Sequence, residues 1–243
     1  GSRGLIGAAV LAAEAAMRAG SGLTELCVPK SIYAIAARKI SPEAMCKPVE
    51  DFGLGAFSPE SLREILPILQ QATAILIGPG IGRHPKTIRW LGKLLKEIDP
   101  QKKIILDADA IYAVAAGPIP WAAHRPDIAV TPHAGEMSKL TGKERAWIES
   151  NACLAARGFS TRHAITVVLK GSRTLCAAAN GTVYINVTGN AALAKGATGD
   201  VLAGMICGLA AQGLSTFDSA RLGVWLHGLA ADLAVESGRD KRT

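Results

Sequence analysis

Aromatic side chains are scarce in this 243-residue chain, since Phe, Trp and Tyr together account for 5% of it. Charged residues are also few, at 19%, whereas 49% of the residues are hydrophobic. A chain this rich in apolar residues can bury a core, which excludes intrinsic disorder. With 26 glycines and few aromatics, the core is expected to consist mainly of Ala, Leu, Ile and Val at close backbone distances.

Cysteine pairs and long apolar runs are lacking as well. The five cysteines are scattered and form no C-x-x-C pair, which argues against a disulfide framework and against a zinc site. A reducing cytosol suits such a chain, so we expect a cytoplasmic protein. The apolar run from Val201 to Ala211 is far shorter than the roughly 20 residues that a membrane span needs.

The charge is positive, because 27 Lys and Arg face 20 Asp and Glu, for a net +7. The basic residues are spread along the chain without interleaved aromatics, and no zinc-finger or RNP motif is present. We therefore expect neither nucleic acid nor a membrane as partner. The positive charge instead favours a pocket for phosphorylated small molecules.

Short apolar runs without period-2 alternation are separated by helical segments, which predicts an α/β domain with a doubly wound, mostly parallel sheet and helices on both faces. The expected strands are 23–28, 74–77, 103–106, 128–130 and 165–169. The expected helices are 4–19, 32–39, 61–71, 87–98, 110–116, 135–140, 144–159, 201–212 and 219–236. Residues 42–59 are expected to be irregular, and Asn180-Gly181 predicts a hairpin with a type I′ turn within 174–187. No linker divides the chain, so we expect one domain over residues 1–243.

Polar and glycine-rich segments follow the predicted strands, where open α/β sheets bind their ligands. G-P-G-I-G at 78–82 favours either a close ligand approach or a structural turn. D-A-D-A places Asp107 and Asp109 where carboxylates can hold magnesium or a ligand hydroxyl, although Asp109 can equally be a helix N-cap. T-P-H-A-G-E offers His133 and Glu136 at the start of a helix.

Two later segments are suited to phosphate chemistry. K-G-S-R-T, Lys170 to Thr174, is a cationic turn that can hold polar parts of a nucleotide. G-A-T-G-D runs directly into a buried helix, so the backbone N–H groups of Gly196, Ala197, Thr198 and Gly199 form an anion hole for a transferring phosphoryl group. Asp200 beside it can take a proton from a hydroxyl, or can simply cap the helix.

These motifs, in this order and together with G-N-A-A-L-A-K before the last one, resemble the ADP/ATP-dependent NAD(P)H-hydrate dehydratase family of the ribokinase-like fold. The resemblance extends from Gly1 to W-L-H-G-L-A at 225–230. It implies a lyase that repairs the S epimer of hydrated NADH or NADPH through a phosphorylated intermediate. ADP or ATP would be the co-substrate, with Mg²⁺ carried on the nucleotide phosphates and Glu136 a possible further ligand.

The resemblance also implies which residues bind each ligand. The expected hydrate-binding residues are Ala8, Gly80, Gly82, His133 and Asp200. The expected nucleotide-binding residues are Lys170, Gly171, Ser172, Arg173, Thr174 and Gly199. Asp107, Asp109, Glu136 and Asn190 are further candidates, and Asp200 is the expected catalytic base.

The chain departs from the family pattern at several points. Ile111-Tyr112 replaces a Leu-Asn pair, and N-A-A-L-A-K, with Lys195 beside the anion hole, replaces N-P-G-M-A-T. The family also has a strand before the first Gly-Ser pair, and this sequence begins at that pair. Some members carry an upstream epimerase domain, which is not present in this sequence. We expect a homo-oligomer whose functional partner is an NAD(P)H-hydrate epimerase.

Two other functions are compatible with the motifs. Vitamin-precursor kinases of the same fold, which act on a hydroxymethylpyrimidine or hydroxyethylthiazole, carry T-P-N-x-x-E where this chain has His133, so His133 favours the dehydratase. A nucleotide-binding sensor without catalysis is the other alternative, and the intact Asp200 argues against it.

Overall fold

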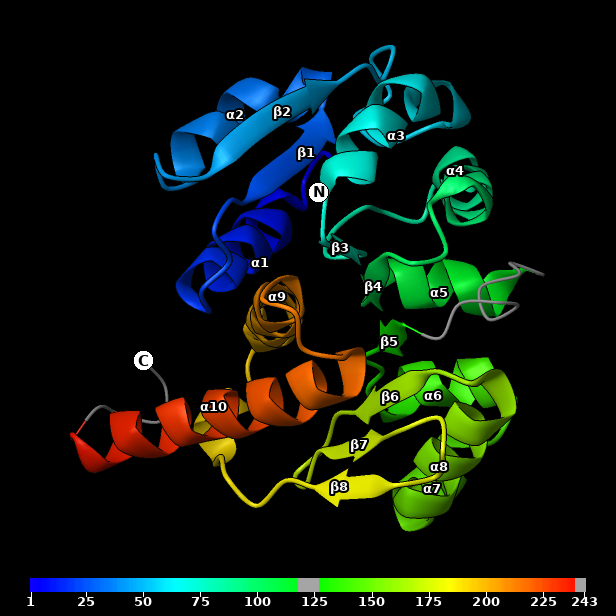
Figure 1. Ribbon diagram of the computed structural model, residues 1–243, viewed down its shortest axis with the longest axis vertical. Helices are drawn as coiled ribbons and strands as arrows, with labels where there is room; N and C mark the ends of the chain where they lie inside the picture. Colours follow the sequence, from blue (N-terminus) through cyan, green and yellow to red (C-terminus); the bar gives the residue numbers. More distant parts are fainter. Residues whose placement is uncertain (118–126, 239–243) are drawn as a thin grey trace.

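The central sheet has six strands in a computed structural model that describes residues 1–117 and 127–238 (Figure 1). Four of the strands run parallel in the order of the chain, and the last two are antiparallel additions at one edge. They are β3 (Ala74–Ile77), β4 (Lys103–Leu106), β5 (Ile128–Val130), β6 (Thr166–Leu169), β7 (Leu175–Ala177) and β8 (Val183–Ile185). A separate parallel pair is formed by β1 (Glu25–Pro29) and β2 (Met45–Val49).

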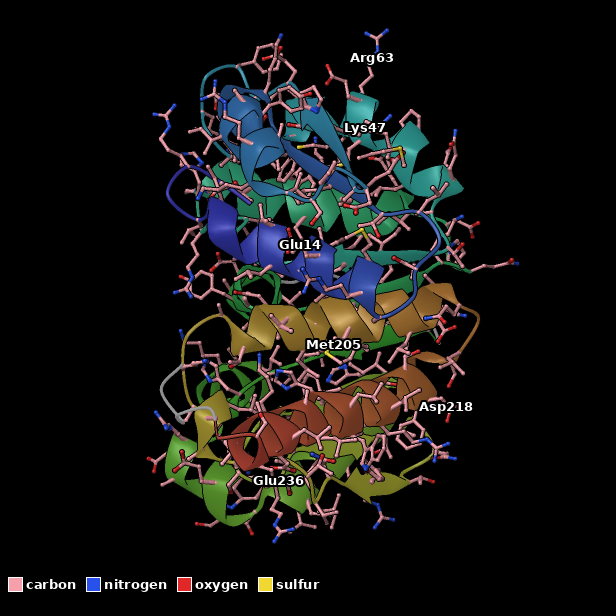
Figure 2. All side chains as sticks on the ribbon, turned by 90° about the vertical axis from the view of Figure 1, so that its left-hand side faces the viewer. Glu14, Lys47, Arg63, Met205, Asp218 and Glu236 are labelled. Atoms are coloured by element: carbon pink, nitrogen blue, oxygen red, sulfur yellow. The ribbon has the colours of Figure 1, made fainter. Side chains whose placement is uncertain are left out.

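Helices cover both faces of the sheet. One layer contains α1 (Ile6–Arg18), α9 (Thr198–Ala211) and α10 (Thr216–Glu236), which lie one beside the next in Figure 2. The other layer contains α3 (Leu62–Gln71), α4 (Pro85–Glu97), α5 (Asp109–Ala116), α6 (Ala134–Thr141), α7 (Arg145–Ser150) and α8 (Ala152–His163). Helix α2 (Tyr33–Lys39) packs against β1 and β2, and three short 3₁₀ turns complete the chain at 30–32, 59–61 and 191–193. The predicted doubly wound, mostly parallel α/β fold is confirmed.

The central strands are buried on both faces, which explains their continuous apolar sequences. In β4, Ile104 and Leu106 pack toward the layer of α4 and α5, whereas Ile105 packs against α9 and α10. All three side chains are fully buried. Because both faces of the sheet are covered, the strands lack the alternation of a half-exposed sheet.

Three predictions of local structure were wrong in detail. Residues 45–49 form β2, which tolerates Pro48 because it is an edge strand paired with β1 alone. The single helix expected over 144–159 is divided into α7 and α8 at Asn151, whose side-chain amide donates to the Trp147 carbonyl. The hairpin is present, but of Asn180 and Gly181 only Gly181 has positive φ, so its turn is not type I′.

Helix α1 approaches α9 so closely that a glycine is required between them. A Cβ built on Gly204 would lie 2.1 Å from the carbonyl oxygen of Ala12. We expect Gly204→Ala to lower the free energy of unfolding by about 1 to 3 kcal/mol, since the helices would have to separate. Gly7→Ala in α1 is the matched control, because nothing lies within 4 Å of its Cβ position. Urea unfolding of both variants checks this; equal stability would contradict it.

No helix in the described part of the chain is long and apolar enough to cross a membrane.

Candidate functional site

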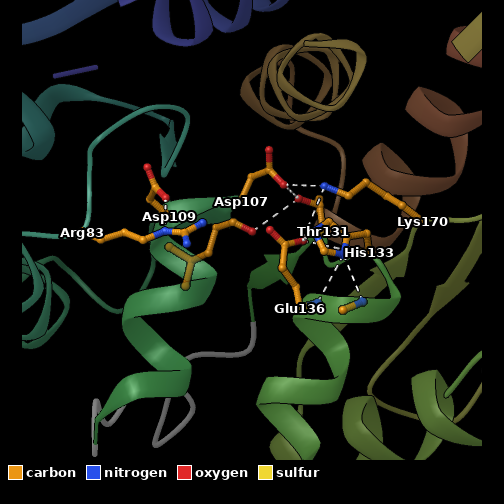
Figure 3. A network of polar contacts seen from close by, with 9 residues as sticks. Arg83, Asp107, Asp109, Thr131, His133, Glu136 and Lys170 are labelled. Carbon is orange, nitrogen blue, oxygen red and sulfur yellow. Dashed lines mark hydrogen bonds and ion pairs between the residues drawn. The ribbon is translucent and has the colours of Figure 1, made fainter. Parts of the chain in front are cut away.

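The segments that follow β3, β4, β5 and β6 lie together at the carboxyl edge of the parallel strands, beside the N-terminus of α9 (Figure 3). Pairing continues past the strands here, because the Lys170 backbone N–H donates to the Pro132 carbonyl at 2.8 Å and His133 bridges to Lys170. The parallel order of the sheet thus brings together loops that are far apart in the sequence.

Lys170 and Asp107 form the centre of the site. The Lys170 ammonium lies 2.8 Å from an Asp107 carboxylate oxygen, and the same oxygen accepts a hydrogen bond from the Thr131 hydroxyl at 2.5 Å. The Asp107 side chain is 2% exposed and that of Lys170 is 20% exposed. The carboxylate therefore fixes the lysine, while the ammonium keeps access to the open side of the site, where an anionic ligand can reach it.

His133 caps helix α6 and is held by Glu136. Its Nδ1 accepts the backbone N–H groups of Gly135 and Glu136, at 3.0 and 3.3 Å, while the Glu136 carboxylate accepts the His133 backbone N–H at 2.9 Å. An Nδ1 that accepts two hydrogen bonds carries no proton, so in the neutral ring the proton is on Nε2. His133 thus presents an N–H donor on a ring whose side chain is 60% exposed.

Asp109 points away from Asp107 and binds the loop after β3. Its carboxylate accepts the Gly82 backbone N–H at 3.0 Å and the Arg83 Nε at 2.8 Å. Ala108, between the two aspartates, has φ 49° and ψ −116°, a conformation that side-chain-bearing residues rarely adopt. Such strain is typical of functional sites, and here it lets two neighbouring carboxylates serve different partners.

Helix α1 forms another wall of the site. A Cβ built on Gly80 would lie 2.4 Å from the Leu5 carbonyl and 3.3 Å from the Ala8 Cβ. Gly80 has φ +63° and no side chain, so the loop after β3 can lie directly on the first turns of α1. The structure thereby places Gly80 and Ala8 side by side, although the sequence separates them widely.

The N-terminus of α9 faces Lys170. The Lys170 ammonium is 3.5 Å from the Cβ position of Gly199, and the first intrahelical bond runs from Val201 N–H to Ala197. The N–H groups before Val201 are therefore not used by the helix and are available to an anion. The Thr198 hydroxyl donates to the Leu193 and Lys195 carbonyls, at 2.9 and 3.0 Å, which closes the loop.

Asp200, in the first turn of α9, is half-buried. Burial raises the pKa of its carboxyl above the ordinary 3.8, the charges of Asp107 and Asp109 act in the same direction, and Lys170 opposes them. A carboxylate with a raised pKa accepts a proton more readily than an ordinary aspartate, which suits a general base.

We expect the rate of any reaction that uses Asp200 as base to fall at acid pH. Because its pKa is raised, the carboxylate is lost at a higher pH than an ordinary Asp, so the acid limb of the kcat profile should have an apparent pKa above 3.8. Turnover at saturating substrate between pH 4 and 8 measures this. A rate that stays level down to pH 4 would contradict the role.

Not every expected site residue joins this cluster. Ser172 and Arg173 are exposed, and none of the described hydrogen bonds or ion pairs links them to Lys170 or Asp200. Gly171 and Thr174 form the turn itself, where the Thr174 hydroxyl donates to the Gly171 carbonyl at 3.4 Å.

Asn190 has a structural position instead. Its side-chain oxygen accepts the Ala192 N–H at 2.9 Å, and its amide donates to Asp232 of α10 at 2.8 Å. Asp232 also accepts the Gly189 N–H at 2.8 Å. The pair thus ties the loop that leads into α9 to helix α10.

Sequence reasoning missed Thr131 and Arg83 as site components, and Asp232 as the partner of Asn190. Thr131 and Arg83 lie within or directly after motifs that the sequence singles out, so their position was the available signal. Asp232 lies in a helix far along the chain and carries no such signal.

Comparison with known proteins identifies the family of this chain. The sequence model of the NAD(P)H-hydrate dehydratase family matches residues 1–239. A bifunctional NAD(P)H-hydrate repair enzyme of Moorella thermoacetica is 39% identical over 235 residues, which cover 97% of this chain and 44% of that protein. An ADP-dependent (S)-NAD(P)H-hydrate dehydratase of Neisseria meningitidis is 35% identical over 98% of this chain and 76% of its own length.

A solved structure is similar throughout. An ADP/ATP-dependent NAD(P)H-hydrate dehydratase from Bacillus subtilis, co-crystallised with ATP and Mg²⁺ and soaked with CoA, has a TM-score of 0.81 at 27% identity. The match covers 100% of this chain and 83% of that one. Against the bifunctional enzymes from Moorella and Thermofilum pendens, this chain spans 44% and 46% of their length. Family model, relatives and fold agree, and the chain belongs to the NAD(P)H-hydrate dehydratase family.

Proposed function

We propose that this chain catalyses the ADP- or ATP-dependent dehydration of the S epimer of hydrated NADH and NADPH, a lyase reaction of metabolite repair. The observation that carries the proposal is the half-buried Asp200 in the first turn of α9, next to Gly199, whose Cβ position lies 3.5 Å from the Lys170 ammonium. Membership of the family and the name of the Neisseria relative, an ADP-dependent dehydratase, support it.

The reaction needs a better leaving group than hydroxide. The nucleotide transfers its terminal phosphoryl group to the hydroxyl at C6 of the reduced nicotinamide ring, and Asp200 takes the proton of that hydroxyl. The ring nitrogen then supplies the electron pair that expels phosphate from C6 and leaves an iminium. Loss of the proton at C5 restores the C5–C6 double bond of the reduced ring. The unused N–H groups from Gly196 to Gly199 would stabilise the negative charge that develops during transfer.

We place the nucleotide between Lys170 and the N-terminus of α9, which the 3.5 Å approach of the ammonium to Gly199 supports. Lys170 would bind its phosphates, with the turn from Gly171 to Thr174 and Gly199 around it. Among the described residues, no group of three His, Cys, Asp or Glu can hold a metal ion. Glu136 accepts the His133 N–H and lies 3.9 Å from Lys170, and its role as a further magnesium ligand stays a prediction. We expect Mg²⁺ to enter on the nucleotide, with its chemistry limited to offsetting phosphate charge.

The hydrated ring would bind on the opposite side, against α1. Ala8 and Gly80, which have small side chains or none, would line this side, and Gly82 lies next to them. The Nε2–H of His133 would donate a hydrogen bond to a polar substituent of the dinucleotide. These assignments follow the family motifs, and the adjacency of Ala8 and Gly80 supports them.

A turnover assay tests the function. The protein is incubated with ADP or ATP, Mg²⁺ and hydrated NADH, and the return of absorbance from the reduced nicotinamide is followed. We expect the S epimer to be converted completely to NADH. Comparing the rate with ADP and the rate with ATP identifies the preferred co-substrate. No recovery with either nucleotide would refute the proposal.

The alternatives give different results in parallel assays. A vitamin-precursor kinase would phosphorylate hydroxyethylthiazole or a hydroxymethylpyrimidine with ATP and leave hydrated NADH unchanged. A sensor would bind nucleotide without turnover of either substrate. His133 and Asp200 favour the dehydratase over both.

We further propose that the protein acts in the cytoplasm as a homo-oligomer and in partnership with an NAD(P)H-hydrate epimerase. The bifunctional names of several relatives support the partnership. The single domain over residues 1–243 stays a prediction.

A further inference from the structure

A cavity of about 190 Å³ adjoins the site at His133. Its lining includes Arg83 from the loop after β3, Tyr112 from α5, and His133, Glu136 and Lys139 from α6 and its cap. His133 is shared with the expected hydrate site. A ligand bound at His133 can therefore extend into this cavity, whereas the adenine nucleotide is assigned to the other side, by Lys170.

Two cations contact one aromatic ring in this cavity. The Arg83 guanidinium carbon is 4.5 Å and the Lys139 ammonium 5.0 Å from the centroid of the Tyr112 ring. Arg83 uses Nε to bind Asp109, so its terminal nitrogens are available as donors. Among the described residues, no carboxylate lies within ion-pair distance of Lys139, and its ammonium contacts the Tyr112 ring.

The two carboxylates near these cations, one of which lines the cavity, have partners of their own. The Asp109 carboxylate accepts hydrogen bonds from Arg83 Nε and the Gly82 backbone N–H. The Glu136 carboxylate accepts the His133 backbone N–H at 2.9 Å. The cavity thus presents an ammonium and a guanidinium that contact one ring, while the Glu136 carboxylate in the same lining faces His133 and Lys170. This donor set is suited to a phosphate group, which accepts several charge-assisted hydrogen bonds at once.

We propose that Arg83 and Lys139, positioned by Tyr112, bind a phosphate group of the dinucleotide substrate. The inference rests on the proposed function, because it takes the dinucleotide as the ligand that contacts His133. Two phosphates of the dinucleotide are possible sources: the 2′-phosphate, which only the NADP form carries, and the diphosphate bridge, which both forms carry.

Binding of NADP⁺ and NAD⁺ by calorimetry, which requires no turnover, tests the proposal. We expect Lys139→Gln and Arg83→Gln each to raise the Kd about 10-fold, because each removes a hydrogen bond to a charged group. If only the binding of NADP⁺ is weakened, the bound group is the 2′-phosphate. If the binding of NADP⁺ and NAD⁺ is weakened equally, the bound group is the diphosphate. In either case the Kd of ADP should stay unchanged.

Lys143→Gln is the matched control, since Lys143 also lies 5.0 Å from an aromatic ring, that of Trp147, but outside the cavity. Affinities of Lys139→Gln and Arg83→Gln equal to that of Lys143→Gln would overturn the proposal. The outcome is independent of the turnover assay. If the protein binds dinucleotide through these cations but does not dehydrate the hydrate, the proposed function is refuted. The proposal that Arg83 and Lys139 bind phosphate still holds in that case.

Discussion

Asp200→Asn should lower kcat for dehydration of hydrated NADH by about 10² to 10⁴-fold, since a well-placed general base contributes that much. The amide keeps the size and helix position of the side chain but cannot take the hydroxyl proton. Nucleotide affinity should change little, because Asp200 is not among the residues expected to bind the nucleotide. Steady-state kinetics with saturating ADP or ATP measures the loss.

The same substitution should stabilise the fold at neutral pH. The pKa of Asp200 is raised in the folded protein, chiefly by burial, so the folded state binds this proton more tightly than the unfolded chain. That contribution to stability is present below the unfolded pKa and is lost as pH rises through the folded value. Replacing the charge should therefore raise the Tm at pH 7, and the gain should vanish at acid pH.

Asp99→Asn is the control for both effects, because Asp99 is exposed in the turn before β4 and caps only the Gln101 N–H. It should alter neither kcat nor the pH dependence of Tm. A rate for Asp200→Asn within a few-fold of the Asp99→Asn rate would remove Asp200 from the mechanism.

Lys170→Met should lower the free energy of unfolding by about 3 to 5 kcal/mol, the range for breaking a buried ion pair. The Asp107 carboxylate, 2% exposed, would retain the Thr131 hydroxyl but no cation at 2.8 Å. Nucleotide affinity should also fall, because the ammonium that faces Gly199 is removed. Guanidinium unfolding and calorimetry with ADP separate the two effects.

A double variant distinguishes the ion pair from the loss of packing. Asp107→Asn combined with Lys170→Met leaves no buried charge, so it should be more stable than Lys170→Met alone. Nucleotide affinity should remain low in both. If the double variant is less stable than the single one, the destabilisation does not come from an unpaired Asp107.

The strands of the central sheet were predictable because burial on both faces leaves a simple signal. The runs at 74–77, 103–106 and 128–130 match β3, β4 and β5 residue for residue. Strand β2 was not predictable in this way, since its partly exposed M-C-K-P-V sequence is stabilised by pairing with β1 rather than by its own pattern. Pairing is a long-range property that local periodicity does not report.

The sequence by itself determined the fold class and the loops that carry the chemistry, because buried strands, glycine-rich turns and a polar residue at each strand end are local features. Only the tertiary structure decided which side chains in those loops meet. Lys170 pairs with Asp107 across 63 residues, and Arg83 with Asp109 across 26. Parallel strand order brings such loops to one edge. The contact of Arg83 and Lys139 with Tyr112 likewise exists only once α5 and α6 have packed side by side, because no local pattern shows which side chains of neighbouring helices will meet.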